Sequence, residues 1–334
     1  MKINKNDLLN SLNQLKTATA QRDIIEHSNH FAFLGDKIAA YNDDIALSVP
    51  TDIDFCGAVP AAELIKLLNR LKTEEIELEI EGGELKFESG KTKGGIKFDP
   101  ECKLPLEELG HMKKWRTVPK DLLPALKTCL FSASKDMSKP KLTCVHVLEN
   151  HVESSDSFRI TQVIIEDAMK FEMLIPAANA AHLVQYDMEK YCKTDGWVHF
   201  KTAENLIFSS RIYLEEYPNI SKFFDIDDPI EILFPKSLME SLDRAEVFGK
   251  ADIAIDSEIA VKIEKKKITV KGQNEIGWSE EQLKMSYSGD PIEFKIHPEQ
   301  FRDILNRTRK VSIDQDHSRI FFEANGFSHL LSLI

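Results

Sequence analysis

The residues that could carry chemistry lie far apart in this chain, and few of them share a pattern. Asp156 and Arg159 could form a charged pair at the start of a strand, where such pairs are usually structural. The adjacent carboxylates Asp43 and Asp44 fall between two expected strands, which is typical of a solvated turn. The run at 264–267, EKKK, falls at an expected hairpin tip and has the same explanation. Paired acids and bases for catalysis are therefore not indicated.

Metal, redox and cofactor chemistry are not indicated either. His146 and His151 flank an expected hairpin turn, and the ten histidines do not cluster at metal-ligand spacing. The five cysteines are scattered without a C-x-x-C pair, which favours reduced thiols. The sequence also has no glycine-rich phosphate loop, no G-x-G-x-x-G and no G-x-S-x-G. We expect no metal, no cofactor and no catalytic residue.

Helical patterns that would position any site occur three times along the chain. Apolar residues at helical spacing fill 5–15, 119–131 and 235–248, and Leu8, Leu122 and Leu238 lie 114 and 116 residues apart. A second helix, opened by a proline, recurs at 59–72, 175–190 and 296–310. A pair of alternating strands follows each of these second helices. Order and spacing together predict a repeat of about 115 residues.

The repeat predicts an α+β protein of three similar domains, each with two helices packed on antiparallel sheet. The expected domains are 1–110, 113–226 and 229–334, joined by acidic, proline-containing linkers at 100–109 and 225–229. Three copies of one fold without a catalytic constellation favour a scaffold over an enzyme. No run of about 18 apolar residues occurs, and the N-terminus lacks the apolar stretch of a signal peptide. We therefore expect a cytoplasmic protein with no membrane partner.

Charge is distributed unevenly along the chain. The net charge of −12 by itself argues against nucleic acid as a partner. However, the six repeated helical stretches hold 17 Lys and Arg against 10 Asp and Glu, which leaves −19 on the remainder. Either helices here are simply rich in lysine, or all six helices face one basic surface. Composition alone does not separate these two interpretations.

Four short motifs, taken in order, resemble those of a known family. Residues 155–160, SDSFRI, stand where bacterial sliding clamps have Thr-Asp-Gly-His-Arg-Leu, and 215–220, EEYPNI, stand where they have Gly-x-Phe-Pro-Asp-Tyr. Residues 287–289 keep Tyr-Ser-Gly, and 329–334 correspond to the C-terminal Val-Val-Met-Pro-Met-Arg-Leu. Over its whole length the chain resembles the beta subunit of DNA polymerase III, as a divergent, phage- or plasmid-like member.

The resemblance implies a homodimeric ring of six domains, with twelve helices lining a hole that encircles duplex DNA. Such a clamp is a processivity factor: it tethers a replicative polymerase by short peptide motifs and is opened by an ATP-driven loader. Two other classes stay open at this stage. One is a clamp-fold adaptor or decoy that does not encircle DNA. The other is an enzyme with its site at a domain boundary.

The resemblance also places basic side chains in the hole, where they would contact phosphates without reading sequence. Lys135, Lys139 and Lys141 lie on a loop that could also touch DNA. The expected DNA-binding residues are Lys16, Lys66, Arg70, Lys120, Lys127, Lys190, Arg244, Arg302 and Arg307.

A head-to-tail dimer contact between the first domain and the partner's third domain is implied in the same way. Val247 and Phe248, at the end of a helix, would pack near an edge strand that contains Ile96 and Phe98. Alternatively, Phe248 is an ordinary core residue, in which case the interface lies elsewhere.

A peptide-binding cleft between the second and third domains is the third implied site. Phe158 replaces the family's histidine and Ser157 its glycine, so we expect a conventional clamp-binding peptide to bind weakly. Alternatively, Leu142, Ile160 and Leu331 are plain strand core. The expected cleft residues are Leu142, Ser155, Ser157, Phe158, Arg159, Ile160, Pro218, Lys222, Phe223, Leu330, Leu331, Ser332 and Leu333.

Overall fold

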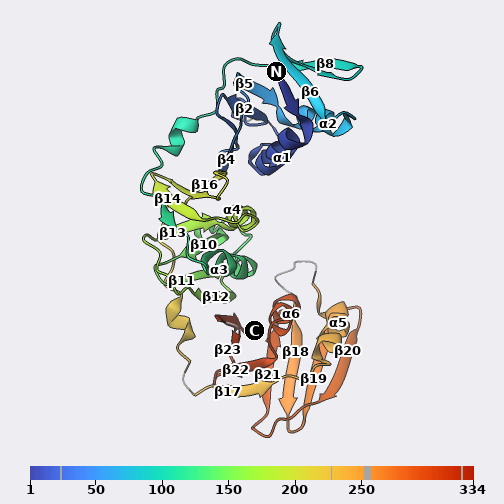
Figure 1. Cartoon of the computed structure of the whole chain (residues 1–334). Coiled ribbons are helices and arrows are strands. Elements are labelled where there is room, and N and C mark those ends of the chain that lie inside the picture. Colours follow the sequence, from blue (N-terminus) through green and yellow to red (C-terminus); the bar gives the residue numbers. More distant parts are fainter. Residues whose placement is uncertain (23–24, 227, 252–256, 325) are drawn as a thin grey trace. The chain divides into compact units, whose positions relative to one another are not determined.

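The structure is a computed structural model that describes residues 1–22, 25–226, 228–251, 257–324 and 326–334 (Figure 1). Each third of the chain repeats one order: a strand, a helix, four strands, a second helix and three strands. The helices of the described residues are α1 (Lys5–Leu15), α2 (Ala61–Arg70), α3 (Leu122–Cys129), α4 (Ala177–Leu183), α5 (Leu238–Gly249) and α6 (Pro298–Leu305). The α+β class and the six repeated helices expected from the sequence are confirmed.

Local sequence explains where these helices begin. The Asn4 side chain caps α1 by accepting from the backbone N–H groups of Asn6 (2.8 Å) and Asp7 (3.3 Å). Pro60 and Pro176 precede α2 and α4, and Pro298 occupies the first turn of α6. A proline there loses no hydrogen bond, because the first N–H groups of a helix have no partner within it.

The second helix of the middle repeat is shorter than the sequence predicts. α4 ends at Leu183, and residues from Lys190 onward form a strand, so the expected helix over 175–190 is wrong in its second half. Tyr191 and Cys192 are both buried, and the strand pairs with its neighbours on either side. Sheet pairing and burial here override a helical spacing of apolar residues.

The chain forms two compact units, residues 1–124 with 173–214 and residues 125–172 with 215–334. The division between these units runs through the expected middle domain, 113–226. The three-domain boundaries therefore remain a prediction. Residue 227, within the expected second linker, lies outside the described residues.

The first unit contains two antiparallel sheets. The larger has the order β5-β2-β3-β4-β16-β15-β14-β9 and the smaller β1-β6-β7-β8. Helices α1 and α2 lie side by side in this unit (Figure 1). The strands of this unit are β1 (Lys2–Asn4), β2 (His30–Leu34), β3 (Lys37–Tyr41), β4 (Ile45–Pro50), β5 (Cys56–Pro60), β6 (Glu75–Glu81), β7 (Glu84–Ser89), β8 (Thr92–Lys97), β9 (Arg116–Thr117), β13 (Met173–Pro176), β14 (Lys190–Thr194), β15 (Trp197–Lys201) and β16 (Ile207–Arg211).

The second unit is built in the same way. Strands follow one another as β10-β11-β12-β24-β23-β22-β17 in one sheet and as β20-β19-β18-β21 in another. The strands of this unit are β10 (Cys144–Val147), β11 (His151–Ser155), β12 (Arg159–Ile164), β17 (Ile230–Leu233), β18 (Ile259–Glu264), β19 (Lys267–Gln273), β20 (Trp278–Lys284), β21 (Ile292–Ile296), β22 (Lys310–Ile313), β23 (Arg319–Ala324) and β24 (Phe327–Ser332).

The repeats are joined by strand pairing at equivalent positions. In each repeat the third strand after the first helix is β4, β12 or β20, and the last strand is β8, β16 or β24. β4 pairs with β16, where Leu47 lies opposite Phe208, and β12 pairs with β24, where Ile160 lies opposite Leu330. Within the described residues, β20 and β8 each end a four-stranded sheet. Two of three equivalent strand pairs are thus formed inside the chain.

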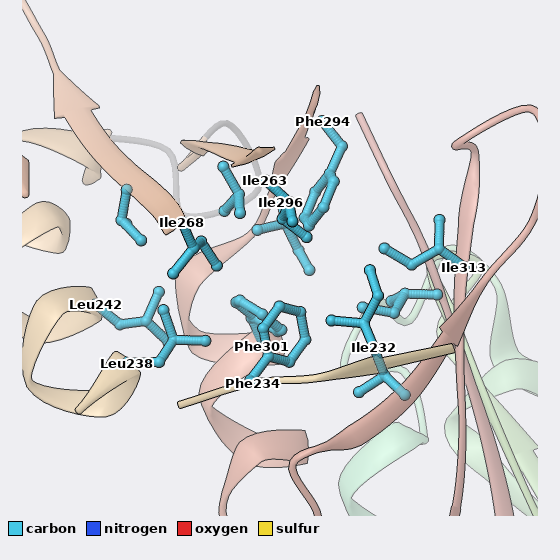
Figure 2. Packing of buried hydrophobic residues seen from close by; sticks show 14 of the residues in the cluster. Ile232, Phe234, Leu238, Leu242, Ile263, Ile268, Phe294, Ile296, Phe301 and Ile313 are labelled. Atoms are coloured by element: carbon cyan, nitrogen blue, oxygen red, sulfur yellow. The ribbon is translucent and has the colours of Figure 1, made fainter. Parts of the chain in front are cut away.

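Apolar side chains from the helices and both sheets of the second unit meet in one core (Figure 2). Phe234 and Phe301 pack edge to face with ring centroids 5.3 Å apart, and Leu238 and Leu242 of α5 are fully buried beside them. Aromatic pairs in this geometry stabilise a core beyond their area alone. Helix α5 is thereby fixed against its sheet.

Candidate functional site

A pocket of about 720 Å³ in the second unit gathers most of the residues of the expected cleft. Its walls come from the loop before β10, the turn before β12, the connector after β16 and the last strand. Nine of the thirteen expected cleft residues line it: Leu142, Ser155, Ser157, Phe158, Ile160, Pro218, Phe223, Leu330 and Ser332. The structure thus brings together segments that are as much as 190 residues apart, from Leu142 to Ser332.

Two phenylalanines stand exposed at this pocket. The Phe158 side chain is 43% exposed and the Phe223 side chain 41%. The carboxylate of Asp156 accepts from the backbone N–H groups of Phe158 (3.1 Å) and Arg159 (3.0 Å), and Phe158 O accepts from Ser332 N (2.8 Å). These bonds hold the turn in place. Exposed aromatic rings beside an apolar pocket are typical of a partner-binding surface.

The same turn contains a residue in an unusual conformation. Ser157 has a φ of 80°, in the left-handed region that glycine adopts without strain. Its hydroxyl accepts a hydrogen bond from the Lys139 ammonium at 3.3 Å, and its backbone N–H donates to Ser155 Oγ at 3.2 Å. The family's glycine at this position is explained by the same backbone geometry.

Charged groups at the pocket were not predicted from the sequence as part of a cleft. Lys139, Lys141 and Arg319 line it together with one acid, Glu215. Arg319 Nε donates to the Asp314 carboxylate at 2.9 Å, so the arginine is held in position. Arg319 lies opposite Ser332 in the β23–β24 hairpin, so a prediction of that strand pairing would have placed Arg319 at the pocket. The other unpredicted lining residues are Ser138, Pro140 and Ile220.

Four expected cleft residues do not line the pocket, and the structure corrects them. Leu331 is 0% exposed in the core of the second unit, and Leu333 packs against that core. The Arg159 guanidinium lies 2.9 Å from Asp156, which is the charged pair expected from the sequence, and also 2.9 Å from Asp303. The Lys222 ammonium lies over the Phe223 ring, 5.3 Å from its centroid. Alternation along β24 explains Leu331, because neighbouring residues of a strand face opposite ways.

A buried polar cluster supports one wall of the pocket. His146 places Nδ1 2.8 Å from Glu153 and Nε2 2.7 Å from Glu172, while His151 Nε2 lies 3.3 Å from Glu153. The ring of Tyr217, next to the lining residue Pro218, lies 4.7 Å from the His146 ring. Burial by itself would raise the pKa of the Glu153 carboxyl, but hydrogen bonds from His146 and His151 outweigh it and lower that pKa to about 2. No group of residues in the described part of the chain has the arrangement of a metal site.

The expected DNA-binding residues divide into two groups. The first group is exposed and forms no ion pair with any described residue. Lys66 and Arg70 lie on α2, Lys127 lies on α3, and Lys16 and Lys120 lie at the end of α1 and just before α3. These five cations are free to meet phosphate.

The second group is engaged within the protein. Arg244 donates two hydrogen bonds to Glu281 (2.8 and 2.9 Å), and Arg302 is paired with Asp243 (3.0 Å) and with Glu246. The Arg307 guanidinium stacks on the Phe131 ring, 4.1 Å from its centroid.

Lys190 also departs from its expected position. It lies on strand β14, not on a helix, and donates to Thr117 Oγ1 at 3.1 Å. Its expected helical position is wrong because α4 ends seven residues earlier, at Leu183.

The expected dimer-contact residues differ in how exposed they are. Val247, on α5, is 68% exposed, and Ile96, on the outer strand β8, is half-buried. Phe98 is a core residue, 5% exposed and packed edge to face on Phe55. Phe248 is half-buried against Gly277, whose neighbours in sequence, Ile276 and Trp278, are both strongly exposed. The sequence did not point to these last two residues.

Over its whole length the chain has the fold of the DNA polymerase sliding clamps, which confirms the resemblance expected from the sequence at the level of the fold. A sliding clamp from Bartonella birtlesii, a DNA polymerase III subunit beta bound to griselimycin, matches with a TM-score of 0.86 and 15% identity. The match covers 100% of this chain and 98% of that one.

Two further solved structures give the same result. The DNA polymerase sliding clamp of Bacillus subtilis matches with a TM-score of 0.83 and 18% identity, over 100% of this chain and 98% of that one. A Helicobacter pylori beta clamp bound to a DNA ligase peptide matches with a TM-score of 0.81 and 15% identity, over 100% and 99%. No protein-family model and no curated protein sequence matches the chain. Among the described helices, none has the length and apolar character needed to cross a membrane.

Proposed function

We propose that this chain is a DNA sliding clamp that acts in the cytoplasm as a homodimeric ring around duplex DNA. It tethers a polymerase and other DNA-processing proteins through their peptide motifs, and a separate loader opens it. The observation that carries this proposal is the full-length match to sliding clamps, at TM-scores of 0.81 to 0.86, together with two outer strands that lack a counterpart in the described chain.

The repeated strand pairing supports ring closure. β4 pairs with β16 and β12 with β24, each time joining the third strand after a first helix to the last strand of the next repeat. The equivalent remaining strands are β20 and β8, which both end four-stranded sheets. Pairing of β20 with β8 of a second copy would complete the series and protect both exposed edges. Because the two surfaces differ, the contact is head to tail and occurs twice in a closed dimer.

The charges of these two edges are partly complementary. β8 carries the exposed Lys93 and Lys97, and Lys93 also lies 2.7 Å from Glu88. β20 carries the exposed Glu280, Glu281, which is bonded to Arg244, and the exposed Lys284. Opposite charges across neighbouring strands favour pairing and disfavour pairing of each edge with itself. The exposed apolar side chains of Val247, Ile276 and Trp278 would provide the buried part of the contact.

The helices supply the proposed contact with DNA. Lys16, Lys66, Arg70, Lys120 and Lys127 are exposed cations on or beside α1, α2 and α3. Lysine and arginine that meet phosphate alone give binding that is indifferent to sequence and falls steeply with salt. A net charge of −12 would discourage DNA from coating the outer surface.

The 720 Å³ pocket is the proposed site for partner peptides. Its apolar lining and the two exposed phenylalanines suit leucine or phenylalanine side chains as anchors. The similar Helicobacter pylori clamp is described as bound to a DNA ligase peptide. We expect a peptide with a glutamine followed by a leucine-rich end to bind here.

One observation favours a second candidate, a clamp-fold adaptor that does not encircle DNA. Arg244 and Arg302, two of the expected phosphate contacts, are already neutralised by Glu281, Asp243 and Glu246. A hole lined by fewer free cations would hold DNA less well. The test must therefore separate ring formation from DNA retention.

The deciding experiment combines molar mass with topology-dependent DNA retention. Light scattering should give twice the chain mass of 38.1 kDa. Protein loaded onto nicked circular DNA should remain bound through a high-salt wash and be released when the circle is cut, because a closed ring can leave only over an end. A dimer that is not retained on circles would favour the adaptor. A monomer at all concentrations would overturn the ring.

A further inference from the structure

A second pocket, of about 240 Å³, lies wholly within the first unit, over the junction of β4 and β16. Its apolar lining comes from strands and from the connector that follows the first repeat: Ala39, Ala46, Leu47, Leu106, Leu109 and Met112. The 720 Å³ pocket has the same construction, since it lies over the β12–β24 junction and under the connector at 215–223. The small pocket is therefore a repeat-equivalent of the peptide site, and nothing in the proposed clamp function uses it.

A buried chain of hydrogen bonds ends in this small pocket. Thr194 Oγ1 donates to the backbone oxygen of Leu109 at 2.9 Å. Having used its only proton, that hydroxyl can only accept from Nε2 of His199, which lies 2.8 Å away. Nδ1 of His199 in turn lies 2.8 Å from the hydroxyl oxygen of Ser209, a residue that lines the pocket.

The protonation of His199 fixes the direction of the whole chain. His199 is fully buried, and burial lowers the pKa of its imidazole to about 4. Near neutral pH the ring therefore carries one proton, on Nε2, and its Nδ1 accepts the proton of the Ser209 hydroxyl. The Ser209 oxygen is left with only lone pairs to offer, so it presents an acceptor to a ligand.

We propose that this pocket binds a small, flat, apolar molecule that carries a single N–H or O–H donor, of which indole is the type. The apolar walls would enclose the ring, and the donor would bond to Ser209 Oγ. A cavity of about 150 Å³ is enough to bind benzene, so 240 Å³ accommodates a molecule of this somewhat larger size. Lys37, Ser48 and His111, which also line the pocket, add polar groups beside this apolar enclosure.

Two isosteric probes test the donor requirement in the full-length protein. Indole and 1-benzofuran have nearly the same shape, but only indole has an N–H group. Titration followed by ligand-observed NMR should show indole binding about three- to tenfold more tightly, the range that one hydrogen bond supplies. Equal affinities would overturn the role of Ser209. Absence of binding by either probe would overturn the pocket as a ligand site.

Substitutions test whether indole and 1-benzofuran bind in this pocket. Ser209→Ala should reduce indole affinity to that of 1-benzofuran and leave 1-benzofuran binding intact, which also shows that the variant is folded. Ala46→Leu should fill the pocket and abolish binding of both probes. The matched control is Ser28→Ala, an equally buried serine of the same unit that does not line the pocket. Full indole affinity in both Ser209→Ala and Ala46→Leu would place the ligand elsewhere and overturn the proposal.

A third probe distinguishes the two natural sources of an indole group. N-acetyltryptophanamide carries the same ring on a peptide backbone. If it binds more tightly than indole, the occupant is a tryptophan side chain of a partner. If it binds more weakly, the occupant is a free small molecule. Because these measurements use neither DNA nor a clamp-binding peptide, their failure would leave the proposed clamp function untouched.

Discussion

Ile160 lies opposite Leu330 in the β12–β24 pair, and both side chains line the 720 Å³ pocket. The strand pairing that joins two repeats is therefore also the base of the candidate partner site. Each residue is nearly buried, yet each contributes surface to the pocket. A ligand in this pocket would contact both sides of the junction at once, so binding would also stabilise that pairing.

Peptide binding should depend on the pocket walls. Leu142→Asp places a charge on an apolar wall, and Phe158→Ala removes an exposed anchor ring. We expect each to weaken a fluorescently labelled clamp-binding peptide by about tenfold or more in anisotropy titrations, within the range of hot-spot residues. Because Leu142 is nearly buried, circular dichroism must first show that the aspartate variant is folded. Wild-type affinity in both variants would show that the peptide does not bind in this pocket.

The dimer contact should respond to charge and to apolar surface. Val247→Asp changes an exposed residue, so it should give a folded monomer by light scattering. Phe248→Asp should also destabilise the fold, because its ring rests against Gly277.

A charge swap tests the proposed strand pairing. Glu280→Lys should weaken dimerisation, and mixing it with Lys93→Glu should restore a dimer, because one joint of the mixed dimer carries both substitutions and the other carries the wild-type residues. If the mixture forms no dimer, β8 and β20 do not pair with each other.

DNA retention should depend on the free cations and not on the paired ones. Arg70→Ala should reduce salt-resistant loading on circular DNA and lower the slope of log affinity against log salt by about one. Arg244→Ala is the matched control, because that guanidinium is already bonded to Glu281. Arg307→Ala should lie between these two, since the ring of Phe131 stacks on the guanidinium without neutralising it. Equal effects of all three variants would contradict the division into free and engaged cations.

Acid should destabilise the second unit through Glu153. The pKa of this carboxyl is about 2 in the folded protein against an ordinary 4.5, so its stabilisation is complete above about pH 4.5 and is lost as the pH falls toward 2. The shift corresponds to roughly 3 kcal/mol of unfolding free energy at neutral pH. Glu153→Gln should remove this amount in urea unfolding at about pH 7, and its effect should fall to less than half near pH 3. An undiminished effect near pH 3 would mean that the carboxylate charge is not responsible.

Much of the fold could be predicted because the same sequence pattern recurs three times along the chain. Proline starts, apolar spacing and strand pairs located all six helices, but two were predicted too long: α4 ends at Leu183 instead of 190, and α6 ends at Leu305 instead of 310. The end of α4 at Leu183 depends on the pairing of β14 with β9, which no local pattern near 190 reveals. Phe98 was misassigned for a related reason: the exposure of a residue just beyond a strand end depends on what packs over it.

The site was predicted less completely than the fold. Nine of the residues that line the pocket could be predicted because they lie in recognisable motifs. Arg319 could not, because it reaches the pocket only through its pairing with Ser332 across the β23–β24 hairpin. The pairing of Arg244 with Glu281 was not predictable from helix composition, because the acid lies on a strand 37 residues away. The acceptor role of Ser209 rests on hydrogen bonds that run through Thr194 and His199, and no spacing in the sequence encodes that sequence of bonds.

The two outer strands, β8 and β20, have a consequence for mixtures of wild-type and variant subunits. Under the proposed pairing, a closed ring needs two identical joints, and each joint uses a different edge of each subunit. A subunit whose β20 edge is blocked can still offer its intact β8 edge to a wild-type partner. The resulting pair would have one sealed joint and one permanently open gap, and would fall off DNA. Such a variant would disable wild-type subunits in proportion to its abundance, although it binds them through a normal joint.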